Sequence, residues 1–114
     1  MQLDIITTEE GRTLTLAGHG EIDIATLDTL ATELDNASRE GIDDVIVDLN
    51  QVTYIDSSGL GVLVGAHRRL KSEGRSLVLR VADAEMIKLL SITGLDQLFA
   101  LELPYEAPTE PDQT

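Results

Sequence analysis

Two adjacent hydroxyl side chains, Ser57 and Ser58, stand between an apolar segment and a predicted helix. They belong to the run Asp56-Ser57-Ser58-Gly59-Leu60-Gly61. A helix start exposes backbone N–H groups, which a side-chain oxygen or an anion satisfies. We expect Ser57 to be the N-cap of this helix, with Ser58 in the first turn and its hydroxyl left open by small neighbours. These residue types therefore predict an accessible acceptor for a phosphoryl group.

A phosphate on Ser58 would add about −1.5 to −2 charge beside a helix N-terminus, where anions are tolerated. The fold is therefore expected to survive the modification. Facing a carboxylate or an apolar patch of a partner, the same charge would cost about 3 kcal/mol, or roughly a hundredfold in affinity. The sequence thus predicts a binding surface that phosphorylation of Ser58 switches off.

A serine at a strand-to-helix turn also occurs in hydrolases, where a base must lie within hydrogen-bond reach. The chain has two histidines. His67 falls about 13 Å further along the same predicted helix, at 1.5 Å per residue, and within its apolar stripe. His19 reaches Ser58 only if its loop borders the site, and the Gly-x-Ser-x-Gly motif is absent. These features argue against a small serine hydrolase, which is kept as the alternative class to a binding protein.

Metal and cofactor chemistry have little support in the sequence. Asp23, Asp48 and Asp56 stand at the ends of predicted strands and are candidates for a magnesium site. Acids at such positions are more often helix caps. The absence of cysteine excludes thiolate metal sites and disulfides, and the glycines after Ser58 lack the spacing of a dinucleotide-binding loop. We expect no metal and no cofactor.

The charge distribution excludes further classes of partner. The 114 residues carry a net charge of −13, and residues 1–56 hold 13 acidic side chains against two arginines. Nucleic-acid binding depends on Lys and Arg at phosphates, and aromatic residues at 3% offer no stacking platform. The start of the chain lacks the pattern of a signal peptide, and no apolar run approaches the length of a membrane span. We expect a cytoplasmic protein that binds neither nucleic acid directly nor membrane.

Hydrophobic periodicity predicts the elements that position the serines. Strands are expected at residues 3–6, 13–17, 45–49, 52–55, 76–81 and 99–103. The segment Gly18-His19-Gly20 is expected to interrupt the regular structure after the second strand. Three helices are expected between the later strands, the first with an apolar stripe that begins at Ile24 and ends near Gly41. Asp23 and Asp83 are the expected N-caps of the first and third helices.

Strands that alternate with helices predict an α/β domain with a mixed sheet of four to five strands. Right-handed crossovers would place the helices mainly on one face of this sheet. The length suffices for one self-sufficient core over residues 1–103. Residues 104–114 contain all three prolines, several acids and few large apolar side chains, so we expect a flexible C-terminal tail.

The run from Asp56 to Gly61 after an apolar strand resembles the signature of the anti-sigma factor antagonists, a branch of the STAS domain family. Gly20-Glu21-Ile22-Asp23-Ile24-Ala25 resembles the family's element before its first helix, and Val47-Asp48-Leu49 resembles its central strand. The resemblance covers residues 3–103 and implies a STAS fold.

The resemblance also implies a partner-switching cycle without enzymatic activity in this chain. The unmodified protein would bind an anti-sigma factor that is an ATP-binding serine kinase of the GHKL type. Phosphorylation at Ser58, with Ser57 as the alternative acceptor, would end binding, and a PP2C-type phosphatase would reverse it. The implied partner-binding residues are Glu21, Asp23, Asp56, Ser57, Ser58, Gly59 and Leu60. A second possibility within the family is an unphosphorylated STAS scaffold in another complex.

Overall fold

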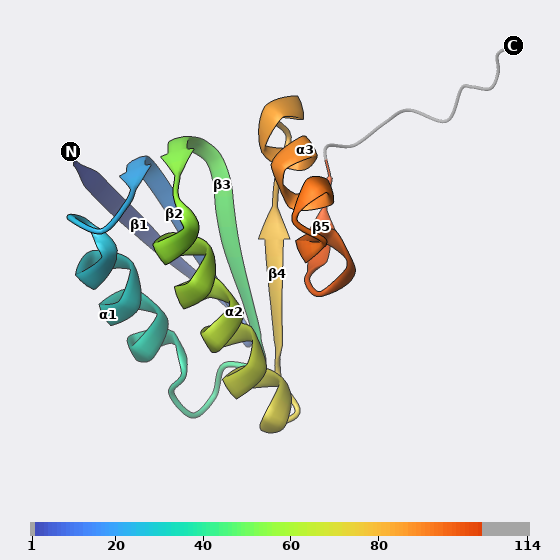
Figure 1. Cartoon of the computed structure of the whole chain (residues 1–114). Coiled ribbons are helices and arrows are strands. Elements are labelled where there is room, and N and C mark those ends of the chain that lie inside the picture. Colours follow the sequence, from blue (N-terminus) through green and yellow to red (C-terminus); the bar gives the residue numbers. More distant parts are fainter. Residues whose placement is uncertain (1, 104–114) are drawn as a thin grey trace, which may run out of the picture.

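The computed structural model describes residues 2–103, and the elements alternate between strands and helices as expected (Figure 1). The predicted tail, residues 104–114, lies outside the described residues. In chain order the elements are β1 (Leu3–Glu10), β2 (Thr13–Ile22), α1 (Leu27–Ala37), β3 (Asp44–Ile55), α2 (Ser57–Ser72), β4 (Ser76–Arg80), α3 (Ala84–Ile92), the 3₁₀ helix η1 (Leu95–Gln97) and β5 (Ala100–Glu102). Among the helices of this described part, none has the length and apolar character needed to cross a bilayer.

The five strands form one mixed sheet in the order β1-β2-β3-β4-β5. Strands β1 and β2 are antiparallel, and the other neighbouring pairs are parallel. Each parallel pair needs a crossover, which α1, α2 and α3 supply in turn. Figure 1 shows α1 and α2 side by side over the sheet, with α3 near the end of β4. The expected α/β class and mixed sheet of four to five strands are confirmed, with five strands observed.

The core lies between the sheet and the helices that cover it. Registered positions of the central strands carry apolar side chains that are at most 2% exposed, namely Leu14, Leu16, Val45, Val47, Leu77 and Leu79. The helices pack buried leucines against this layer, namely Leu30 and Leu34 of α1 and Leu63 and Leu70 of α2. This period-2 burial fixes the register of β3, because a shift by one residue would turn its buried side chains to the other face.

The start of α1 differs from the expectation. The helix begins at Leu27 with Thr26 as N-cap, three residues after the predicted cap at Asp23. The Asp23 carboxylate accepts hydrogen bonds from the N–H groups of Ala25 at 2.9 Å and Thr26 at 3.1 Å. This local turn competes with helix formation and delays it. Ile24 therefore lies outside the apolar stripe and is 75% exposed. The helix also ends at Ala37, before the predicted stop at Gly41.

The predicted break at Gly18-His19-Gly20 is an irregularity within one continuous strand. Strand β2 runs through to Ile22, and β3 carries one extra residue at each of two register shifts opposite this segment. Such bulges bend a strand and increase its twist. Gly20 adopts a φ of +124°, and a Cβ there would lie 2.2 Å from the carbonyl oxygen of Gln2. Residues 45–49 and 52–55, expected as two pieces, are parts of β3.

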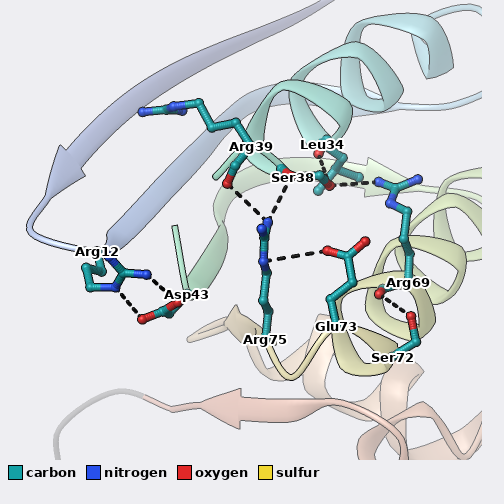
Figure 2. A network of polar contacts seen from close by, with 9 residues as sticks. All are labelled: Arg12, Leu34, Ser38, Arg39, Asp43, Arg69, Ser72, Glu73 and Arg75. Carbon is teal, nitrogen blue, oxygen red and sulfur yellow. Dashed lines mark hydrogen bonds and ion pairs between the residues drawn. The ribbon is translucent and has the colours of Figure 1, made fainter. Parts of the chain in front are cut away.

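Arginines join the C-terminal ends of α1 and α2, at the end of α2 away from the serines (Figure 2). Arg75 donates to the backbone oxygens of Ser38 at 2.8 Å and Arg39 at 3.1 Å. Arg69 donates to the hydroxyl of Ser38 at 3.2 Å. Arg75 thereby satisfies carbonyl groups at the negative end of the α1 dipole, and Arg69 adds a second positive charge there. The two helices are thereby tied together at one end, which helps to fix the position of the other end.

Candidate functional site

The serines lie where β3 ends and α2 begins, beside the end of β2. Ile22 pairs with Ile55, and the backbone N–H of Asp56 donates to the oxygen of Ile22 at 3.1 Å. Glu21 pairs with Tyr54 one position earlier. The loop between β2 and α1 is therefore held next to the first turn of α2. The two segments that the sequence linked to partner binding come together at this edge of the sheet.

Asp56, not Ser57, is the N-cap of α2. Its Oδ1 atom accepts hydrogen bonds from the backbone N–H groups of Ser58 at 3.0 Å and Gly59 at 3.1 Å. The backbone of Asp56 is extended, as an N-cap requires. A charged carboxylate also interacts more strongly than a hydroxyl with the positive end of the helix dipole. The expected cap at Ser57 is wrong by one residue, and Ser57 is an exposed residue of the first turn.

The same carboxylate binds the Ser58 hydroxyl. Ser58 Oγ donates to Asp56 Oδ1 at 2.5 Å, and the Ser58 side chain is half-buried. This hydrogen bond is the largest cause of a lowered pKa for Asp56, followed by the backbone N–H of Gly59. The N–H groups of Ser58 and Ile24 act in the same direction, and partial burial opposes them. Asp56 is thus a stable carboxylate that orients the Ser58 oxygen and can accept its proton.

Gly59 and Leu60 have structural roles in this arrangement. Both are buried. A Cβ on Gly59 would lie 2.4 Å from Cγ2 of Ile22 and 2.9 Å from Cγ1 of Ile55. Only glycine therefore lets the first turn of α2 pack this closely on the ends of β2 and β3. Of the first-turn residues in the predicted site, Ser57 and Ser58 retain exposed surface.

The neighbouring loop is ordered by buried polar contacts. Thr26 donates its hydroxyl proton to the backbone oxygen of Glu21 at 2.7 Å, and Asp23 is only 6% exposed. Oδ2 of Asp23 has no hydrogen-bond partner within residues 2–103. Glu21 is half-buried, whereas Ile24 points outward beside the first turn of α2. Sequence reasoning missed Ile24 as a surface residue, although the Asp23-x-x-Thr26 pattern of a local turn was available as a signal.

The other polar candidates lie apart from the serines. Asp48 accepts a hydrogen bond from the N–H of Asn50 at 2.9 Å. Its Oδ2 atom also forms an ion pair with Nη1 of Arg80 at 3.6 Å. Within residues 2–103, no group of three or more His, Asp or Glu side chains is placed to hold a metal ion. His67 is 9% exposed and packs edge-on against Phe99, with ring centroids 5.3 Å apart, as its place in the apolar stripe predicted. His19 is exposed on β2.

Known proteins share both the sequence pattern and the fold of this chain. The STAS domain family matches residues 4–109. An anti-sigma-B factor antagonist of Staphylococcus aureus is 33% identical over 98 residues, which cover 86% of this chain and 91% of that protein. The crystal structure of an anti-sigma factor antagonist from Mycobacterium paratuberculosis superimposes with a TM-score of 0.81 at 21% identity, over 91% of this chain and 87% of that one. The Bacillus cell fate determinant SpoIIAA in its phosphorylated form has a TM-score of 0.69 at 19% identity, over 92% and 93% of the two chains.

Proposed function

Because the chain belongs to the STAS domain family, we propose that it is an anti-sigma factor antagonist with no enzymatic activity of its own. In this proposal the unmodified protein binds an anti-sigma factor that is also a serine kinase, and so releases a sigma factor in the cytoplasm. The kinase uses ATP to phosphorylate Ser58, which ends binding. A PP2C-type phosphatase removes the phosphate and resets the cycle.

The observation that carries this proposal is the 2.5 Å hydrogen bond from Ser58 Oγ to Asp56 Oδ1 at the start of α2. In phosphoryl transfer to a hydroxyl, a carboxylate accepts the proton as the oxygen attacks the γ-phosphorus. The Ser58 hydroxyl already donates a hydrogen bond to Asp56, and the lowered pKa of Asp56 keeps this carboxylate ionised at neutral pH, ready to accept a proton. Ser57 is more exposed, but no side-chain hydrogen bond to it is present in the described residues. This difference favours Ser58 as the acceptor.

The same geometry explains how a phosphate would act as a switch. A phosphoryl group on Ser58 carries about −1.5 to −2 charge and would be placed beside the Asp56 carboxylate. The two anions would compete for the backbone N–H groups at the helix start, so the first turn would rearrange as well as gain charge. SpoIIAA has this fold and has been solved phosphorylated, which supports a fold that tolerates the modification.

The partner surface in this proposal combines charged and apolar groups around Ser58. Ile24, whose backbone N–H faces Asp56, offers a side chain that is 75% exposed, while Ser57 is exposed and Glu21 is half-buried. Asp23, Gly59 and Leu60 are buried and act as positioning residues that hold the loop and the first turn in place. A new negative charge at the centre of such a surface would oppose an apolar or acidic contact.

Intact-mass measurement after incubation with the cognate kinase and ATP tests the acceptor. We expect the mass of one phosphate on the wild type and on Ser57→Ala, and none on Ser58→Ala. Phosphorylation of Ser58→Ala but not of Ser57→Ala would instead identify Ser57 as the acceptor. An unmodified wild type that still binds the kinase would favour the unphosphorylated scaffold, and ester hydrolysis lost in Ser58→Ala would favour the hydrolase.

Calorimetric titration with the same kinase tests the switch. Ser58→Asp is expected to weaken binding roughly a hundredfold, because it places a fixed carboxylate at the helix start. Ser72→Asp is the matched control, since Ser72 is exposed at the other end of α2. Equal affinities for wild type and Ser58→Asp would contradict the switch.

A further inference from the structure

A groove of about 260 Å³ lies between the last residues of β3 and helix α3. Its floor is apolar and comprises Val52, Ile55 and Met86, each 7% exposed, with Leu89 partly buried beside them. The groove ends at Ile55, immediately before Asp56. It therefore borders the Ser58 site without containing the serine.

The groove exists because β3 extends beyond β4. Pairing between these strands ends at Asp48 and Arg80, whereas β3 continues to Ile55. Bulges such as the two opposite β2 bend a strand and increase its twist, and Figure 1 shows β3 curving away from β4 over this stretch. Beyond Asp48, no strand within residues 2–103 pairs with β3 on the side opposite β2. This side is a short sheet edge to which an extended segment can add by backbone hydrogen bonds.

The rim combines exposed apolar and acidic side chains. Tyr54 is 49% exposed on the β3 side. On α3, Glu85, Leu89 and Ile92 follow helical spacing along one face, and Ile92 is 73% exposed. Asp83 and Glu85 add negative charge to the lining. Large exposed apolar side chains gathered at a groove are typical of an interaction site.

We propose that this groove docks an extended segment of a partner protein that alternates apolar with Lys or Arg side chains. The apolar side chains would enter the floor over Val52 and Met86. The cations would meet Asp83 and Glu85 at the rim, while Lys88 of α3 lies outside the lining. Backbone groups of the segment would pair with the free edge of β3.

Charge distinguishes the cationic partner segment from two other possible occupants of the groove, which are residues 104–114 of this chain and a second copy of the chain. Residues 104–114 contain Glu106, Glu110 and Asp112 without a Lys or Arg, so the acidic rim disfavours them. A second copy would bring another net charge of −13. A cationic segment is the occupant whose charge complements the groove. Because Ser58 takes no part in these contacts, docking here would persist after phosphorylation.

Two synthetic probes test the groove directly by NMR titration of the full-length, isotope-labelled protein. One is a capped hexapeptide that alternates valine with lysine, and the other replaces each lysine with glutamate. We expect the lysine peptide to shift the amide signals of residues 51–55 and 85–92, and the glutamate peptide to leave them unchanged. We expect Ser58→Asp to bind the lysine peptide as the wild type does, so that this test stands apart from the kinase switch.

Two variants locate the binding, and one serves as a matched control. Glu85→Gln removes a rim charge and Tyr54→Ala removes an exposed apolar wall, and each is expected to weaken the lysine peptide by about fivefold or more. Glu40→Gln removes an exposed carboxylate in the loop after α1 and is expected to change nothing. Melting curves establish that each variant is folded. The proposal would be overturned if the amide signals that shift lay outside the groove, if both peptides gave the same response, or if both groove variants bound the lysine peptide as the wild type does. It would also be overturned if sedimentation showed a dimer that forms through Tyr54 and Ile92.

Discussion

At the start of α2, a single carboxylate caps the helix and orients a hydroxyl. The sequence predicted a helix start with two serines at its edge, and this is what the structure contains. It did not predict which residue is the cap, because Asp and Ser have nearly equal N-cap preferences. A shift of one residue decides which serine is exposed and which is bound to Asp56. The structure was therefore needed to identify the cap residue, whereas the sequence alone identified the segment in which it lies.

His67 makes folding sensitive to mild acid. Burial lowers its pKa below the ordinary value of 6.5, and the charges of Lys71 and Arg68 lower it further. A lowered pKa means that the unfolded chain binds a proton more readily than the folded one. The stability from neutral His67 is therefore complete above the unfolded pKa and is lost as pH falls from 6.5 to the folded pKa. We expect the melting temperature to fall over the pH window that begins near 6.5 and extends downward.

Two histidine variants separate this effect from other titrations. His67→Leu keeps an apolar contact with Phe99 and is expected to flatten the melting temperature over that pH window. His19→Gln changes the exposed histidine and is expected to retain the wild-type slope. If both variants keep the slope, the acid sensitivity has another origin.

At the scale of elements, periodicity located the strands and helices but not the local competition at their ends. The buried stripe of α2 and the apolar run at residues 45–49 dominate their segments, and the helix and this part of β3 were both predicted. The turn at Asp23 is a local interaction over residues 23–26 that shifts the start of α1, and hydrophobic periodicity does not reveal it. The bulges in β3 likewise depend on pairing with β2, which is a long-range contact.

We expect substitution by alanine to have opposite effects on stability among the three glycines of α2. Gly59→Ala would place a Cβ 2.4 Å from Ile22 Cγ2, so we expect a loss of about 1–3 kcal/mol from overpacking. A Cβ at Gly61 or Gly65 would meet nothing within 4 Å. Alanine at each of these sites should therefore stabilise the helix by about 0.5–1 kcal/mol. Urea denaturation measures all three, and a stabilising Gly59→Ala would show that the first turn can move away from β2.

For the molecule as a whole, the sequence predicted the architecture because the order of elements leaves few ways to build a sheet. The hairpin places β2 beside β1, and each later strand lies beside the one before it in the chain, so the sheet keeps the order of the sequence. The groove beside β3 was not predictable in this way. It arises from the relative lengths of β3 and β4 and from the twist between them, and neither is written in any single segment.

Charge is also a property of the whole chain, and it predicts a response to salt. The net charge is −13, and several ion pairs are on the surface, such as Arg12 with Asp43, whose side chains are 64% and 52% exposed. Exposed pairs contribute little to stability, so repulsion among the excess acids should dominate. Salt shortens the screening length from about 30 Å at 0.01 M to about 10 Å at 0.1 M. We expect the melting temperature to rise by several degrees over this range of sodium chloride.

A charge-reversed variant tests whether repulsion is the cause. Asp4→Lys combined with Glu40→Lys changes two exposed acids and brings the net charge from −13 to −9. Because fewer excess charges remain to be screened, this variant should melt higher than the wild type at low salt and gain less from added salt. A melting temperature that falls with salt, or the same salt response in both proteins, would instead mean that the surface ion pairs outweigh the repulsion.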